Sequence, residues 1–437
     1  MTARGRMLAY GGALIVLEFA FYGFFFTLWV DGQQALYRDL VWAYGVAAEQ
    51  WLFLDLEVVL SWAECHRLGY DVMSVNPCDV YGRLSLYSPL LPLLPLRMRD
   101  LFPLGVALDA LYFVVVALVL RPASFPRLVL SAVVALSTAS FFAVDRANLD
   151  VLVFILGALA AWCSVRSAKA RLVGYALLSL AGLLKFYPFA ALITLLREGE
   201  RRALAIGGIV AAGLAILGAE FWADLVRVPS LMPRLPPYHD VYGISIFGFG
   251  AAQFFALPDA LVPLLTAPLL VAALAAAIWF YRSVIREPRL IDWDGVDMRL
   301  LLVGATFVVA CFFASNNVGY RQILLILCVP GLIQIRRATL RAGTRIAMTV
   351  ALAALIYRLC EMSVEQVINF VLDSLGLLDL LQNTFGILTW VLRELAWWWM
   401  VAIFAAFIAH FATHSTLYEG AAGRWFRRPP LSGRAAG

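Results

Sequence analysis

The chain has 437 residues, of which 63% are hydrophobic and only 14% are charged, and its mean hydropathy is +0.84. A soluble domain is usually about 45 to 50% apolar and about 25% charged, so this composition excludes a soluble enzyme. The net charge of +5 is spread along the chain without a basic cluster among stacking aromatic residues, which argues against a nucleic-acid partner.

Apolar blocks recur at the length that a helix needs to cross a hydrocarbon core of about 30 Å. They predict an all-α polytopic membrane protein with about 12 transmembrane helices, some of them short or re-entrant. The first block is too long for a signal-peptide core and has no small-residue cleavage site, so we expect it to be the first span. In chain order the expected spans are 7–30, 100–120, 127–144, 148–164, 172–184, 188–196, 203–222, 257–281, 300–314, 322–335, 346–358 and 395–412.

These spans divide a single membrane domain, 1–437, into regions. Residues 31–99 form a first extracytoplasmic loop with interfacial helices, 100–222 a transmembrane core, 257–412 the C-terminal transmembrane helices and 413–437 a cytoplasmic tail. Most of the 34 lysines and arginines fall on the side that carries the N-terminus, so the positive-inside rule predicts that both termini are cytoplasmic. Unusual polar sequence gathers on the other side, where we expect the chemistry.

Two candidate carboxylates, Asp55 and Glu57, lie early in the first outer loop. A carboxylate that is partly shielded from water at the membrane interface can have its pKa moved toward the working pH and act as a general base. The residues themselves do not distinguish the two, and a solvated loop acid is the alternative for each. Cys65 and Cys78 share this loop and can form a disulfide if the compartment is oxidising.

Two polar breaks between later spans face the same side. The segment Asp145–Asp150 contains Arg146 and Asn148, and its alternative interpretation is a capped turn in which Arg146 pairs with a neighbouring aspartate. Lys185 stands at a proline-marked turn between two short apolar blocks, and an ionisable group within a span usually faces a functional cavity. Arginine and lysine at one membrane surface suit a lipid phosphate.

Three further outer segments carry candidates. Residues 223–250 contain four prolines followed by Tyr238 and His239, and residues 316–322 contain Tyr320 and Arg321, which is either a phosphate ligand or a snorkelling side chain. Residues 361–393 alternate acidic and apolar side chains, as an interfacial helix would. The sequence contains no zinc-protease, nucleophile-elbow or Walker-type motif, so we expect the substrate itself to supply the energy.

The order of these motifs resembles the GT-C superfamily of membrane glycosyltransferases. The matching motifs are the Asp-x-Glu of the first outer loop, an Arg-x-Asn-x-Asp turn and a Lys-x-Tyr-Pro hairpin, which together span roughly residues 50–190. Within the superfamily the chain is most similar to family 87, the polyprenol-phosphate-mannose-dependent mannosyltransferase type. The second half of the chain resembles the family in hydropathy and in the outer pair Tyr320 and Arg321.

The resemblance implies an inverting transfer of mannose, or another monosaccharide or pentose, from a polyprenyl-phosphate donor. The acceptor would be a glycolipid or glycan on the extracytoplasmic face of a bacterial plasma membrane, with membrane lipids as further partners. Asp55 would be the catalytic base. No cofactor or protein metal site is required, although a divalent cation between Asp55 and the phosphate stays open. The remaining residues fall into a donor-phosphate set, Arg146, Lys185, Arg321 and His239, and a substrate-binding set, Glu57, Asn148, Asp150, Tyr187 and Tyr320.

Two features depart from the family pattern. The loop segment 76–83 differs from that of the well-studied members, and the chain has no large soluble C-terminal domain, so the sugar and the acceptor stay open. The alternative function is a lipid flippase or solute transporter, in which Arg146 and Lys185 line the substrate pathway. A transporter usually has two related halves, and no such repeat is present in this sequence. A non-catalytic assembly partner is a third hypothesis.

Overall fold

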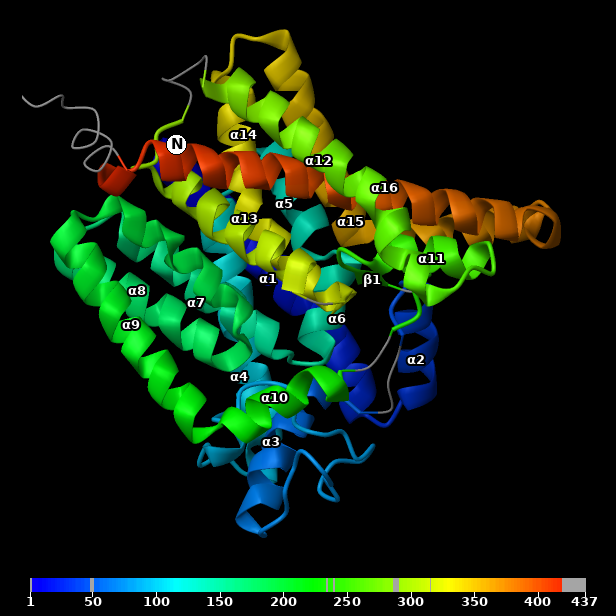
Figure 1. Cartoon of the computed structure of the whole chain (residues 1–437). Coiled ribbons are helices and arrows are strands. Elements are labelled where there is room, and N and C mark those ends of the chain that lie inside the picture. Colours follow the sequence, from blue (N-terminus) through cyan, green and yellow to red (C-terminus); the bar gives the residue numbers. More distant parts are fainter. Residues whose placement is uncertain are drawn as a thin grey trace, which may run out of the picture.

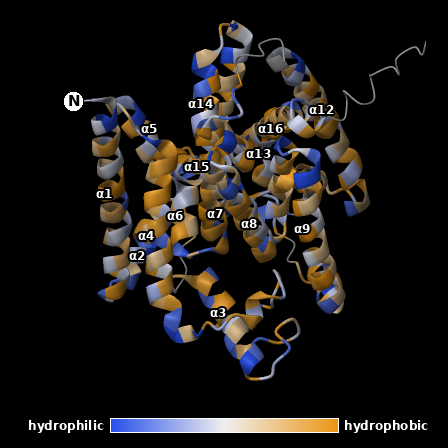
Figure 2. Cartoon of the chain, turned by 90° about the vertical axis from the view of Figure 1, so that its left-hand side faces the viewer, coloured by the Kyte–Doolittle hydropathy of each residue, from blue (hydrophilic) through white to orange (hydrophobic). Residues whose placement is uncertain are grey.

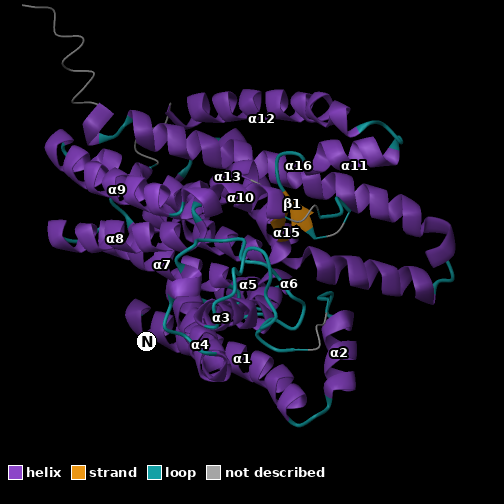
Figure 3. Cartoon of the chain, turned by 60° about the horizontal axis from the view of Figure 1, so that its bottom comes forward, coloured by secondary structure: helices purple, strands orange, loops and turns teal. Residues whose placement is uncertain are grey.

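The computed structural model describes residues 2–47, 51–232, 235–238, 240–285, 291–314 and 316–418. This part of the chain is almost entirely helical, which confirms the predicted all-α class (Figure 3). Its strands, β1 (Val241–Tyr242) and β2 (Asn317–Val318), form one antiparallel ribbon in which Val241 pairs with Val318.

Seven of the described helices are long and apolar enough to cross a membrane. The chain is therefore an integral multi-pass membrane protein. The seven are α1 (Ala3–Val30), α4 (Leu101–Leu120), α9 (Glu200–Glu220), α12 (Val262–Ile285), α13 (Val296–Ala314), α15 (Ala342–Ser374) and α16 (Leu378–Thr413).

An eighth candidate span is bent. Residues 127–144 were expected to form one helix, but α5 (Phe125–Ala135) and α6 (Thr138–Asp145) meet at an angle of 50°. Between them, the hydroxyl of Ser137 accepts a hydrogen bond from the backbone N–H of Ser140 at 3.3 Å and so begins a new helix. The bend directs the end of α6 toward the outer elements.

The other expected spans are shorter helices. They are α7 (Leu149–Ser164), α8 (Ala168–Lys185), η3 (Tyr187–Arg197), η5 (Gly319–Cys328) and α14 (Val329–Ala338). Both η segments are 3-10 helices, which rise about 2.0 Å per residue against about 1.5 Å in an α-helix, so few residues cover more depth. The expected hairpin at residues 185–188 is present: α8 ends at Lys185, and Pro188 lies in the first turn of η3.

The third outer segment is helical. Residues 361–393, which were expected to form an interfacial helix, form the adjoining ends of α15 and α16, which turn at Gly376. Of its charged side chains, Glu361 and Arg393 are buried, whereas Asp373 and Asp379 are exposed. Both helices are therefore much longer than their apolar blocks.

Helix α3 and the loops that adjoin it, which belong to the predicted first outer loop, lie beneath the helix bundle, at the end opposite the N-terminus (Figures 1 and 2). A disulfide joins Cys65 to Cys78 and thereby ties residues 71–83 to α3 (Leu54–Arg67). Arg227 of α10 donates a hydrogen bond to Asp71 at 3.1 Å. The remaining elements of this kind and the short connecting helices are α2 (Gln34–Ala43), η1 (Leu91–Leu93), η2 (Met98–Asp100), α10 (Trp222–Leu231), α11 (Ile246–Phe254) and η4 (Asp259–Leu261).

The hydrophobic core lies around α13, which is largely buried by α7, η3, η5, α14 and α16. Helices α9 and α12, by contrast, expose most of their apolar side chains, as expected where a helix faces lipid.

Candidate active site

The start of α3 docks onto the turn between α6 and α7. The backbone N–H of Phe53 donates to the carbonyl of Asp145 at 2.8 Å, and that of Asp55 donates to the carbonyl of Arg146 at 3.1 Å. The first N–H groups of a helix have no partners within the helix, so this docking satisfies them and fixes the position of the first turn. It places the Asp55 side chain over the polar turn.

Both carboxylate oxygens of Asp55 accept hydrogen bonds from this turn. Asn148 donates its amide to Oδ2 at 2.6 Å, and Arg146 donates to Oδ1 at 3.2 Å. A second arginine, Arg83, lies 3.6 Å from Oδ1. The Asp55 side chain is 14% exposed, so it is held firmly but remains accessible. Arg146 thus pairs with a carboxylate that lies 91 residues away in the chain.

Asn148 connects Asp55 to Lys185. Its carbonyl oxygen accepts a hydrogen bond from Lys185 Nζ at 3.0 Å, while its amide nitrogen donates to Asp55. Lys185 also donates to Asp150 at 2.7 Å, and its side chain is only 1% exposed. The oxygen of Asn148 also accepts from the backbone N–H of Asp150 at 2.8 Å, which caps α7 and fixes the orientation of the amide.

Asp150 accepts hydrogen bonds from side chains of three other elements. In addition to Lys185 of α8, it accepts a hydrogen bond from the hydroxyl of Tyr187 in η3 at 2.6 Å and one from Arg321 in η5 at 3.2 Å. The ring of Tyr320 lies 5.7 Å from Lys185 Nζ. The structure thus joins eight of the predicted residues in one cluster: Asp55, Arg146, Asn148, Asp150, Lys185, Tyr187, Tyr320 and Arg321.

Glu57 lies next to this cluster and is connected to Asp55 through Arg83. Its carboxylate contacts Arg83 at 2.9 Å and is not in contact with Asn148 or Lys185. Burial, followed by a hydrogen bond shared with Asp79, raises the pKa of Glu57 to about 8. Although burial opposes the change, hydrogen bonds from Arg83 and Glu57 lower the pKa of Asp79. Glu57 and Asp79 thus form a pair in which the proton belongs to Glu57, and their common partner is Arg83.

Sequence reasoning missed two contributors. Arg83 reaches Asp55, Glu57 and Asp79, and the ring of Tyr87 lies 4.5 Å from Lys185 Nζ, where an aromatic face stabilises a cation. The available signal was the Cys65–Cys78 pair, which brings the end of the loop back to α3. The predicted His239 lies outside the described residues.

The backbone is strained at three places around the cluster. Phe53, Ala147 and Phe186 have φ values of +60°, +44° and +59°, which cost a residue other than glycine about 1 to 3 kcal/mol each. Each one directly precedes or follows an element that supplies a cluster side chain. The fold thus holds strained turns where the three loops converge, a pattern that is typical of functional sites.

Two hollows adjoin the cluster. Tyr87 lines a pocket of about 370 Å³ whose wall contains both polar side chains, such as His66 and Asp224, and apolar ones, such as Met73 and Phe221. An apolar groove of about 720 Å³ runs between α8 and α9, and Phe221 lines both hollows. Within the described residues, no three His, Cys, Asp or Glu side chains are placed to hold a metal ion. The geometry offers an accessible carboxylate beside several cations, which suits deprotonation of a hydroxyl and stabilisation of an anionic leaving group.

A family model for glycosyltransferase family 87 matches residues 87–315, just over half of the chain. The chain belongs to glycosyltransferase family 87. The match includes Arg146, Asn148, Asp150, Lys185 and Tyr187, and it leaves Asp55 and Arg321 outside its bounds. No curated protein and no solved structure matches the chain. Membership of family 87 confirms the predicted family and indicates a glycosyltransferase rather than a transporter.

Proposed function

We propose that this family 87 glycosyltransferase moves a monosaccharide or pentose, with mannose as the family's example, from a polyprenyl-phosphate donor. The acceptor is a glycolipid or glycan on the extracytoplasmic face of the plasma membrane. The observation that carries the proposal is the double role of Asn148, which binds Asp55 on one side and Lys185 on the other. A basic carboxylate and a group of cations are thereby fixed in one site.

In the proposed reaction Asp55 takes the proton of an acceptor hydroxyl as that oxygen attacks the anomeric carbon. The bond between this carbon and the phosphate oxygen breaks on the opposite face of the sugar, which inverts the configuration, through an oxocarbenium-like transition state. Asp55 uses one acceptor site on each oxygen for Arg146 and Asn148, and an ionised carboxylate has about four such sites, so a hydroxyl can still donate to it.

The departing polyprenyl phosphate leaves as an anion and needs cations rather than a proton. Arg146 and Arg321 are 15% and 13% exposed and take the direct contacts, whereas Lys185 at 1% exposure contributes its charge from behind Asn148 and Asp150. A preorganised donor of this kind typically stabilises a transition state by about 3 to 4 kcal/mol. His239 remains a predicted member of this set.

The apolar groove between α8 and α9 supports a lipid-linked donor. Leucine, isoleucine and valine side chains dominate its walls, and it opens where α9 is exposed to lipid. It meets the pocket of about 370 Å³ at Phe221, and that pocket reaches Tyr87 beside Lys185. A polyprenyl chain in the groove would therefore point its phosphate end toward Tyr87 and Lys185.

Asp55→Asn tests the proposal. The amide preserves the shape of the side chain but cannot take a proton, and loss of a general base usually lowers the rate by about 10² to 10⁴. Transfer of labelled sugar from a polyprenyl-phosphate sugar in detergent should fall by that factor, while the protein still expresses and elutes as a folded species. Asp39→Asn removes an exposed carboxylate of α2 in the same outer loop and is the matched control. Full transfer by Asp55→Asn would remove Asp55 as the base.

A further inference from the structure

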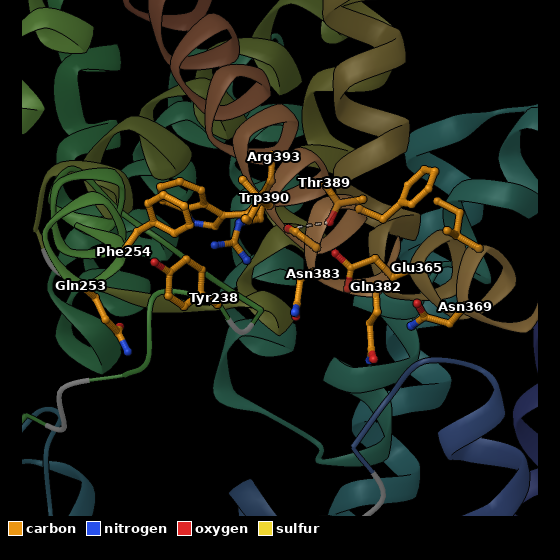
Figure 4. A pocket seen from close by; sticks show the side chains of 14 residues that line it. Tyr238, Gln253, Phe254, Glu365, Asn369, Gln382, Asn383, Thr389, Trp390 and Arg393 are labelled. Carbon is orange, nitrogen blue, oxygen red and sulfur yellow. Dashed lines mark hydrogen bonds between the residues drawn. The ribbon is translucent and has the colours of Figure 1, made fainter. Parts of the chain in front are cut away.

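Another pocket, distinct from the two hollows described above, lies apart from the cluster around Asp55. It has a volume of about 750 Å³ and is formed by α11, the segment before β1 and the adjoining ends of α15 and α16 (Figure 4). Its aromatic wall contains Trp390, whose ring stacks on Phe247 at 5.4 Å with an interplanar angle of 4°, and Tyr238 at 5.3 Å. Gly250 lets α11 approach closely, since a Cβ there would lie 2.3 Å from the Trp390 ring. This wall is rigid.

Uncharged amides face the aromatic wall. Gln253, Asn369, Gln382 and Asn383 line the pocket, and their side chains have no hydrogen-bond partner among the residues that the structure describes. Figure 4 shows Gln382 and Asn383 extending in the same direction from α16. The indole N–H of the largely buried Trp390 is also without a partner in this part of the chain. The pocket therefore offers both donors and acceptors that a ligand can satisfy.

The charges around the pocket disfavour an anionic ligand. Arg393 donates to the carbonyl of Pro237 and pairs with Glu394 at 3.3 Å. Arg358 pairs with Glu361 and lies 3.6 Å from Asp240. With Glu365 on the pocket wall, this group holds four acids and two arginines. A phosphate would meet no uncompensated cation here, whereas a neutral polyhydroxyl compound meets amides and an aromatic face.

The pocket is connected to the Asp55 cluster through one short segment. Arg321 donates to Asp150, and the next residue, Gln322, donates to Asp240 at 2.9 Å. Asp240 directly precedes β1, and the N–H of Gly319 donates to its carbonyl at 3.0 Å. Thus one side chain of η5 contacts the Asp55 cluster, and the next contacts the residue before β1.

We propose that this pocket binds neutral sugar residues of the acceptor, away from the hydroxyl that reacts. The proposal rests on the transferase function proposed above for the acceptor, but the ligand class rests on the pocket itself. A pyranose or furanose ring presents C–H groups to Trp390 and hydroxyls to the amides of α15 and α16. Such a pocket gives the enzyme a preference for acceptors that already carry several sugars.

The test uses Gln382→Ala/Asn383→Ala, which removes two exposed amides and leaves the aromatic wall intact. The matched control is Gln33→Ala/Gln34→Ala, which removes two exposed amides at the start of α2. The probes are neutral trisaccharides of mannose, arabinose and glucose, for binding by saturation-transfer NMR, and their decyl glycosides, for transfer. Decyl monosaccharides of the same sugars serve as short acceptors.

We expect at least one trisaccharide to bind the wild type and Asp55→Asn, and its signal to be lost in the α16 double variant only. The ratio of kcat/KM for trisaccharide over monosaccharide acceptors should fall about 5- to 150-fold in that variant, since the two amides each lose one hydrogen bond that contributes about 0.5 to 1.5 kcal/mol.

An unchanged ratio, or the absence of any bound trisaccharide, would overturn the pocket while leaving the transferase intact. Amide-dependent trisaccharide binding by a wild type that transfers no sugar would overturn the transferase and the acceptor role, and it would keep the pocket as a sugar site.

Discussion

Lys185 offers a sharp test because the chain has only two lysines, Lys169 and Lys185, and both lie on α8. Lys169 is exposed near the start of the helix, whereas Lys185 is buried at its end. Lys185→Met keeps an unbranched side chain and removes the ammonium group. Lys169→Met makes the same change on the same helix, away from the cluster, and is the matched control.

Removing one partner of a buried ion pair usually lowers stability by about 3 to 5 kcal/mol, because the other charge is left alone. Asp150 keeps Arg321 at 3.2 Å and Tyr187 at 2.6 Å, so we expect a smaller loss of roughly 2 to 3 kcal/mol. The effect on catalysis should be larger. Loss of one preorganised cation behind the leaving phosphate should lower kcat by about 10² to 10³.

The assay compares initial rates of sugar transfer in detergent over a range of donor and acceptor concentrations, with thermal unfolding measured on the same preparations. Lys185→Met should lower kcat/KM for the donor far more than it changes the acceptor KM, and Lys169→Met should match the wild type. Equal effects on donor and acceptor, or more than a tenth of wild-type transfer by Lys185→Met, would refute a role in binding the phosphate.

Three further predictions concern the surroundings of the cluster. Because burial raises the pKa of Glu57 from 4.5 to about 8, the folded protein holds this proton more tightly than the unfolded chain. The free energy of unfolding should therefore fall as the pH rises from about 5 to 8. Glu57→Gln should flatten that slope, as measured by thermal unfolding over this pH range. Cys65→Ser/Cys78→Ser should lower stability by about 2 to 4 kcal/mol and should make transfer insensitive to dithiothreitol, which would inhibit the wild type by freeing the loop of Arg83. Gly319→Ala should lower transfer at least tenfold, since its Cβ would lie 1.5 Å from Asp240 Oδ2 and push η5, with Arg321, away from Asp150; wild-type transfer would show that the ribbon does not position η5.

The sequence predicted those features that depend on local pattern. The long apolar helices follow from block length, and the turn after Lys185 follows from Pro188. It failed where packing decides. Glu361 and Arg393 belong to a stretch that suggested an interfacial helix, but both side chains are buried, Glu361 beside Arg358 and Arg393 against the carbonyl of Pro237. Their burial depends on how α15 and α16 pack against other elements, which no local pattern reveals.

The candidate site also combines features that follow from local sequence pattern with features that depend on packing. That Asp55, Arg146 and Lys185 share one face followed from the order of the spans, and the resemblance to family 87 assigned their roles. Their contact through Asn148 could not be predicted, because it depends on the docking of α3 onto the turn after α6. Arg83 was missed for a related reason. Its loop has no regular pattern, and its direction is fixed by the disulfide and by Asp79.

The ion pair between Asp150 and Arg321 has a consequence for biogenesis. The aspartate enters the bilayer early in synthesis, with its lysine neighbour close behind, but the arginine follows 171 residues later. A nascent chain arrested before η5 would hold the early helices without the late cation and without the ribbon that seats it. If Arg321 binds the donor phosphate as proposed, such a chain should transfer no sugar until η5 has been made and inserted.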